Sequence, residues 1–203
     1  MSDPNIDKGR RRMLTLATSA VGAVGVGFAV TPFVLSMTPS ARARAAGAPV
    51  EVDISKLEDG VLLTVEWRGK PVWIVKRTPA MMENLGKDTD LLSDPGSEVE
   101  SQQPAFAKNP GRSQDTHPEI SVLVGICTHL GCSPLEKYAV GAASDMGDDW
   151  PGGYFCPCHG SKFDMSGRVF KNVPAPKNLV VPPYKYLSET QILIGEGPEE
   201  GKA

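Results

Sequence analysis

The hydrophobic and polar positions of the chain show one long apolar stretch close to the N-terminus. Met13–Met37 is an uncharged run of 25 residues that directly follows the basic residues Arg10, Arg11 and Arg12. A membrane-spanning helix needs about 20 predominantly apolar residues. The pattern therefore predicts one N-terminal transmembrane helix within residues 1–37.

The rest of the chain has a different pattern. From Val50 onward the apolar residues come in short β-branched runs between turn residues, which predicts an all-β domain over residues 49–203. Strands are expected at Val50–Ile54, Leu62–Trp67, Pro71–Lys76, Ile120–Ile126, Tyr154–Cys156, Lys162–Asp164, Arg168–Phe170, Leu179–Val181 and Gln191–Ile194. No expected strand is followed by a crossover helix, so an antiparallel β-sandwich or small barrel is favoured.

Two segments interrupt this organisation. Residues 38–48 contain no large apolar side chain and predict a flexible hinge between the apolar helix and the β domain. Residues 79–118 form a polar insertion with prolines and one expected short helix near Ala80–Leu85. Covering an edge of the sheet is one role open to this insertion.

Charged residues on the two sides of the apolar stretch predict its orientation. Lys8 and the three arginines precede it, whereas Arg42 and Arg44 follow it, so the N-terminus is expected in the cytoplasm. The arginine triplet followed by Met13 and Leu14 resembles a twin-arginine export signal. Small residues near Ala43 fit a cleavage site, but the apolar run is longer than a usual signal core, which favours a retained anchor.

The composition excludes some function classes. The chain has 40% hydrophobic residues and a net charge of −3, so it can form a core and lacks the basic stripe of a nucleic-acid binder. No phosphate-binding loop, catalytic triad or heme motif occurs. All four cysteines and two of the three histidines fall between positions 127 and 159.

Those residues form two similar segments. The first Cys/His loop is Cys127-Thr128-His129-Leu130-Gly131-Cys132, and the second Cys/His loop is Cys156-Pro157-Cys158-His159-Gly160-Ser161. Thiolate and imidazole bind both zinc and iron. The C-x-H spacing of the first loop departs from the usual C-x2-4-C spacing of structural zinc sites, but a zinc site stays open as an alternative.

A two-iron, two-sulfur cluster uses these residues more evenly. Cys127 and Cys156 can hold one iron, and His129 and His159 the other, which is Rieske-type ligation. The remaining cysteines, one in each loop, can then form a disulfide, which persists outside the cytosol. The disulfide and the export signal thus both indicate that this part of the chain lies outside the cytosol.

The two loops resemble the paired motifs of the Rieske subunits of cytochrome bc complexes, the ubiquinol–cytochrome c oxidoreductases of bacteria. The N-terminal anchor, the Ala-rich hinge and Val173–Pro176, which is similar to the family's proline loop, extend the resemblance. It implies a single-pass protein of the bacterial inner membrane with a periplasmic head at 49–203. The cluster-binding part of that head would lie at about 122–178, inserted into an antiparallel β-sandwich.

The resemblance also implies roles for individual residues. Cys127, His129, Cys156 and His159 would ligate one 2Fe-2S cluster, with Cys132 and Cys158 forming the disulfide and Ser161 donating to a cluster sulfide. His159 would meet quinol as the catalytic residue of a translocase. The head would then carry one electron to cytochrome c1 by moving on the hinge. Cytochrome b and cytochrome c1 would be partners in a dimeric complex.

The sequence departs from the family's common form at a few positions. Phe163 stands where many members have a tyrosine whose hydroxyl donates to a cluster cysteine, so a lower midpoint potential is expected. The loop Pro134–Gly153 is long and acidic, and a solvated loop is favoured over a docking surface. Leu130 is expected at the exposed tip, and His117 is expected to be a surface histidine.

Two other functions share parts of this pattern. The Rieske subunit of a periplasmic oxidase such as arsenite oxidase shares the ligands and the export signal, but the proline loop and the hinge favour the bc complex. A zinc-binding, non-redox membrane protein is the alternative from another class. A soluble dioxygenase ferredoxin is disfavoured because such proteins lack the disulfide cysteines and the export segment.

Overall fold

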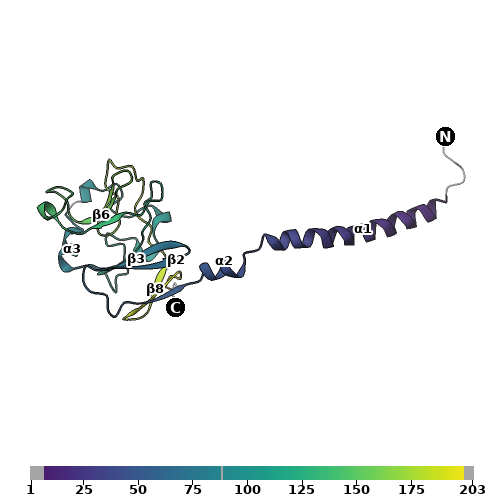
Figure 1. Ribbon diagram of the computed structural model, residues 1–203, viewed down its shortest axis with the longest axis horizontal. Helices are drawn as coiled ribbons and strands as arrows, with labels where there is room; N and C mark the ends of the chain where they lie inside the picture. The colour runs from purple at the N-terminus through teal and green to yellow at the C-terminus, as the bar shows by residue number, and fades with distance from the viewer. Residues whose placement is uncertain (1–6, 88, 199–203) are drawn as a thin grey trace. The chain divides into compact units, whose positions relative to one another are not determined.

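In the computed structural model, residues 7–87 and 89–198 are described. Two compact units divide the chain, one ending at Ala45 and the other beginning at Ala46. The first unit contains the helix α1 (Lys8–Ser36), which runs for 29 residues and has Pro32 inside it (Figure 1). Asp7 caps this helix by accepting hydrogen bonds from the backbone N–H groups of Gly9 and Arg10.

The helix α1 is long and apolar enough to cross a membrane, a property that a signal sequence shares. Its side chains are all exposed within the chain, as expected for a helix whose apolar surface faces lipid. The segment 38–48 contains a second, short helix, α2 (Ala41–Ala46). The flexibility of this segment and the retention of the anchor stay predictions.

The second unit, the head, is mainly antiparallel β-sheet, which confirms the predicted fold class. Its three sheets have three strands each, in the orders β1-β9-β8, β2-β3-β4 and β5-β6-β7. The first sheet consists of β1 (Val50–Asp53), β8 (Tyr184–Ser188) and β9 (Gln191–Ile194). The second consists of β2 (Leu62–Trp67), β3 (Lys70–Lys76) and β4 (Ile120–Val124). The third consists of β5 (Leu135–Lys137), β6 (Gly153–Cys156) and β7 (Ser161–Phe163).

The first two sheets share one hydrophobic core. Val52, Ile192 and Ile194 of the first sheet belong to the same buried cluster as Val72 and Val122 of the second. All five residues of β4 are buried, because this apolar run has protein on both faces. In Figure 1, β8 and β6 lie at opposite ends of the head, with β2 and β3 between them. The sandwich thus forms the base on which the third sheet is built.

The insertion 79–118 packs against the third sheet. It contains the helix α3 (Pro79–Asn84) and the short 3-10 turns η1 (Thr89–Leu91), η2 (Glu100–Gln102) and η3 (Ala105–Ala107). Phe163 in β7 pairs with Val169, and Phe170 pairs with Leu92 of the insertion. The insertion therefore extends the edge of the third sheet, which is the role that the sequence left open.

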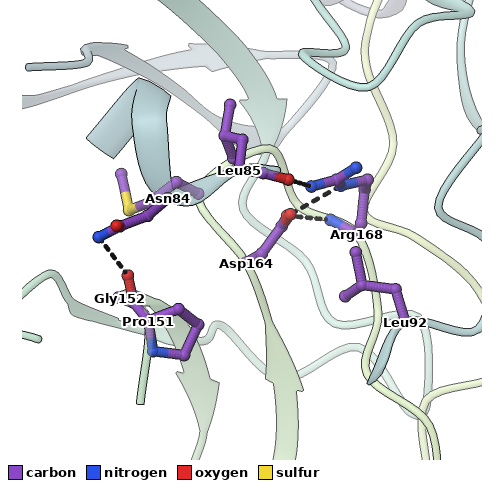
Figure 2. A pocket seen from close by; sticks show the side chains of 8 residues that line it. Asn84, Leu85, Leu92, Pro151, Gly152, Asp164 and Arg168 are labelled. Carbon is purple, nitrogen blue, oxygen red and sulfur yellow. Dashed lines mark hydrogen bonds and ion pairs between the residues drawn. The ribbon is translucent and has the colours of Figure 1, made fainter. Parts of the chain in front are cut away.

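Buried arginine side chains hold the insertion in place. Arg168 forms an ion pair with Asp164 at 2.7 Å and donates to the carbonyl oxygen of Leu85 at 2.6 Å, as Figure 2 shows. Arg112 donates to the carbonyl oxygens of Gln102 and Ser166, and burial lowers its pKa to about 10. Each guanidinium thus joins the insertion to the segment around residues 164–168.

Most predicted strands are confirmed within one or two residues, and the helix α3 lies where the short helix was expected. The expected strand Arg168–Phe170 is reduced to isolated bridges at Val169 and Phe170. The prediction of a strand at Leu179–Val181 is wrong. This segment makes single backbone hydrogen bonds to different neighbours, including one from Val124 N–H to the carbonyl of Val180. The prolines that follow, Pro182 and Pro183, lack the N–H groups that a ladder needs. The strands β5 and β8 were not predicted.

Candidate functional site: two Cys/His loops joined by a disulfide

The first Cys/His loop leaves the end of the buried strand β4. Gly125 lies between this strand and the loop, two residues before Cys127, and a Cβ atom at this position would overlap the indole ring of Trp73. The loop closes on itself, because the N–H of Cys127 donates to the carbonyl of Cys132 at 2.7 Å. The N–H of Gly131 also donates to the carbonyl of Cys127, at 3.1 Å. Gly131 has φ of 85°, a conformation that glycine adopts without strain.

The second Cys/His loop is the turn of a β-hairpin. It connects β6 with β7, and Cys156 and Ser161 are register partners on these strands. The N–H of Gly160 donates to the carbonyl of Cys156 at 2.9 Å. The paired strands therefore fix both ends of this loop.

A disulfide bond joins the two loops. It links Cys132 and Cys158, the two cysteines expected to form it, with their Cα atoms 6.7 Å apart. The sulfur of Cys156 lies within 4.8 Å of both disulfide sulfurs. Because a disulfide sulfur is no longer a thiolate ligand, these three cysteines do not form a metal site of their own.

The structure leaves two thiols and two imidazoles for a cofactor. Cys127 and Cys156 are free and each is only 2% exposed. The rings of His129 and His159 lie edge to face, with their centroids 4.7 Å apart. His129 is half-buried and His159 is exposed. The loops thus place two thiols inside and two imidazoles toward the surface.

The environment of Cys156 suits a buried sulfur ligand. Burial raises the pKa of its thiol, and the backbone N–H groups of Cys158 and His159, which bond to the sulfur, lower it. The neighbouring Cys127 thiol raises it further. Backbone N–H groups that point at a ligand sulfur are among the groups that tune an iron–sulfur cluster.

Ser161 has a donor that a group bound between the loops could use. Its side chain is fully buried, and its Oγ accepts a hydrogen bond from the N–H of Ala175 at 3.0 Å. The hydroxyl proton has no acceptor among the hydrogen bonds of the described residues. Ser161 is also the register partner of the free Cys156, so its donor lies beside a thiol. A sulfur-containing group held by the free thiols would supply an acceptor, so these residues fit an iron–sulfur cluster.

The proline-rich segment 173–178 contacts both loops. Besides the bond from Ala175 to Ser161, the carbonyl of Lys177 accepts a hydrogen bond from the Thr128 hydroxyl at 2.6 Å. Sequence reasoning identified this segment only by resemblance and missed its contacts, together with the close approach at Gly125. The two prolines flanking Ala175 were the signal that could have pointed to a fixed backbone donor.

Other residues singled out in the sequence have definite positions. Leu130 is 72% exposed, which confirms the expected exposed tip. Phe163 is fully buried opposite Tyr154. His117 lies at the surface near Glu119 and Glu189 but is only partly exposed, since it packs on Tyr186 with ring centroids 4.2 Å apart.

The loop Pro134–Gly153 is more ordered than a simple solvated loop. Its first residues form β5, and Trp150 near its end is buried, stacked on Phe170 and bonded through Nε1 to the carbonyl of Lys137. Asp145 pairs with Lys137 at 2.7 Å. Asp148 and Asp149 are exposed, as expected.

Ligand count alone allows two cofactors. Two cysteines and two histidines can form a tetrahedral zinc site or hold a two-iron cluster with one residue pair on each iron. The Ser161 hydroxyl can donate to a ligand sulfur in either site, so it does not separate them.

Comparisons with known proteins identify the relatives of both units. A family profile described as "Ubiquitinol-cytochrome C reductase Fe-S subunit TAT signal" matches residues 1–40, and one described as "Rieske [2Fe-2S] domain" matches residues 50–185. The ubiquinol-cytochrome c reductase iron-sulfur subunit of Allochromatium vinosum is 61% identical, covering 97% of this chain and 93% of that protein. The protein of the same name from Blastochloris viridis is 43% identical, covering 93% of each.

A solved structure described as "Hyperthermophilic respiratory Complex III" contains a chain that is 26% identical. The alignment covers 88% of this chain and 98% of that one, with a TM-score of 0.44.

Proposed function

The chain belongs to the family of ubiquinol-cytochrome c reductase iron-sulfur subunits, and from this premise we propose how its residues carry out electron transfer. Its cofactor is one Rieske-type 2Fe-2S cluster, which when bound takes up and gives back one electron at a time. Cys127 and Cys156 hold the inner iron, and His129 and His159 hold the outer one. Zinc is thereby set aside.

His159 is the residue that meets quinol in this proposal. It is exposed, and it belongs to the loop that the paired strands β6 and β7 hold most firmly. An imidazole needs only one nitrogen for a metal, so the other is free to accept or donate a hydrogen bond at the surface. His159 thereby orients the quinol hydroxyl, and the exposed side chain of Leu130 contacts the apolar part of the same partner site.

The protein acts within a membrane complex. Its partners are cytochrome b and cytochrome c1, and the assembly is a dimeric quinol–cytochrome c oxidoreductase of the translocase class. The N-terminus lies in the cytoplasm of a bacterial cell, α1 crosses the inner membrane once, and the head faces the periplasm. The supporting observations are the basic residues before α1 and the apolar, fully exposed surface of that helix.

The single observation that carries the proposal is the pair of buried free thiols next to two imidazoles, in loops joined by a disulfide. It is tested by electron paramagnetic resonance of the reduced full-length protein in its native membrane. Changing Cys127, Cys156, His129 or His159 to serine or glutamine should each abolish the Rieske signal. His117→Gln is the matched control and should leave it unchanged. A signal that survives in any ligand variant would contradict the ligand set.

The proposed cytochrome partners and the proposed movement on the hinge 38–48 are tested by separate experiments. Purification in mild detergent should yield b-type and c-type hemes with the chain, and their absence would contradict the proposed complex. A run of prolines across residues 42–46 should slow quinol oxidation without altering the cluster spectrum, because it stiffens the segment on which the head moves. Unchanged turnover would contradict the moving head.

A further inference from the structure

One backbone N–H group lies between the two prolines of Val173–Pro176. Proline has no N–H, so Ala175 offers the only amide donor of Pro174–Pro176. That donor is used on Ser161, with a distance of 3.0 Å between Ala175 N and Ser161 Oγ. Ala175 is 4% exposed and Ser161 is fully buried, so water does not compete for the bond.

The bond restricts what the Ser161 hydroxyl can do. A hydroxyl has one proton to donate and two lone pairs to accept with. Because the Ala175 N–H occupies one lone pair, the hydroxyl proton cannot point toward the proline segment, where donor would meet donor. The hydrogen bonds of the described residues offer that proton no acceptor within the protein. Because Ser161 pairs with the free Cys156 across β6 and β7, the proton is free to point toward the group held by the Cys/His loops.

We propose that Ala175 is a positioning residue for the redox site: its N–H orients the Ser161 hydroxyl toward a cluster sulfur and so raises the reduction potential. The inference rests on the proposed ligand set. A hydrogen bond to a cluster sulfur favours the reduced state, which carries one more negative charge. An N–H that fixes the direction of the hydroxyl strengthens this effect without contacting the cluster.

The backbone around Ala175 is fixed before any electron arrives. Pro174 has a locked φ angle, and Pro176 confines Ala175 to extended conformations. At the end of the proline-rich segment 173–178, Asn178 accepts a hydrogen bond from the N–H of Val169 at 2.9 Å and donates to the carbonyl of Asp94 at 3.0 Å. The donor therefore stays in place in both oxidation states, and no reorientation of the hydroxyl opposes reduction.

A double-mutant cycle measured by redox titration tests the inference. Ala175→Pro removes the N–H, Ser161→Ala removes the hydroxyl, and the third variant combines them. Ser161→Ala should lower the equilibrium constant for reduction about tenfold, which is about 59 mV for a one-electron couple. Ala175→Pro should lower it by about three- to tenfold. In the Ser161→Ala background it should have no further effect, because the group through which it acts is gone.

Lys177→Arg is the matched control, since it alters an exposed side chain of the same segment but keeps the charge, both prolines and the Ala175 N–H. It should leave the potential close to that of the unchanged protein. If Ala175→Pro does not load a cluster, replacing residue 175 with lactic acid by cell-free translation removes the N–H as a backbone ester and adds no ring. That variant should show the same drop.

The outcomes separate this inference from the proposed function. Absence of a Rieske signal in the unchanged protein would contradict the proposed ligand set. A normal cluster whose potential falls equally in both backgrounds, or does not fall in Ala175→Pro and the ester, would overturn the positioning role alone.

Discussion

The two Cys/His loops have similar sequences but different mechanical support. The first follows a single buried strand, closes through its own backbone bonds and carries Leu130 at 72% exposure. The second is the turn of a hairpin whose flanking residues, Cys156 and Ser161, pair across β6 and β7. The second also has the bond from the proline segment to Ser161. The first loop thus mainly presents an exposed side chain, Leu130. The second loop holds Ser161, the residue proposed to tune the redox site, in a fixed position between paired strands.

The support of the second loop extends to the insertion, and removing Arg168 is expected to give the largest effect on stability. Arg168→Met leaves Asp164 buried without its cation, so the free energy of unfolding should fall by about 3–5 kcal/mol. Lys171→Met is the matched control. Lys171 also bonds to the insertion, through the carbonyl of Asp90, but it is exposed, and its loss should cost about 0.5 kcal/mol or less.

Chemical denaturation of the cluster-loaded protein provides the measurement. Equal losses in the two variants would show that the insertion does not support the second loop more than any surface contact does.

The disulfide connects the first Cys/His loop to the second, which is the more firmly supported of the two. Replacing Cys132 and Cys158 together with alanine removes a closure that spans 26 residues, which should cost about 3.5 kcal/mol in the chain-entropy model. Amide hydrogen exchange should rise more at Leu130 and Gly131 than at Gly160, because only the second loop has paired strands on both sides.

Thiol reductant is the control for this pair. It should bring the unchanged protein to the stability of the variant and leave the variant unaffected. Equal exchange rates in the two loops would break the distinction drawn between them.

Phe163 tests whether a residue of strand β7 can change the reduction potential. Phe163→Tyr adds a hydroxyl on the face of the third sheet that also carries Ser161, since side chains alternate along a strand. A new donor to a cluster cysteine should raise the equilibrium constant for reduction about tenfold, or about 59 mV. Phe155→Tyr adds the same hydroxyl to the other face of β6 and should leave the potential unchanged. A Phe163→Tyr variant with an unaltered potential would refute the tuning role.

The smallest effect is expected in the first loop. Thr128→Val keeps the shape of the side chain but removes the bond to the carbonyl of Lys177, which should cost about 1 kcal/mol of unfolding free energy. The potential should barely change, because this hydroxyl donates to the protein. A shift in potential as large as that of Ser161→Ala would place tuning in both loops.

Some features of the fold and of the redox site could be predicted from the sequence, and others could not. The strands of the sandwich were predictable because runs such as Ile120–Val124 carry their own periodicity and burial signal. The disulfide partners followed from cysteine counting once the ligands had been assigned. Both depend on local patterns or on residue types with few possible uses.

The remaining features depend on distant contacts. The bond from Ala175 to Ser161, the packing of His117 on Tyr186 and the ion pair of Arg168 join segments whose proximity no local pattern specifies. The strand β5 is short and mostly exposed, so its pairing with β6 decides its conformation. Tertiary context determined these features, and sequence periodicity carried no trace of them.

The double closure at the base of the loop Pro134–Gly153 has a consequence for evolution. The disulfide closes a covalent ring from Cys132 to Cys158, and the pairing of β5 with β6 closes it again nearer the loop, at Lys137 and Gly153. Residues 139–149 lie within the loop that both closures tie together at its base, so changes in chain length there leave the spacing of the ligands intact. This stretch is therefore a segment that lineages can lengthen, shorten or recharge while the redox site beside it stays fixed.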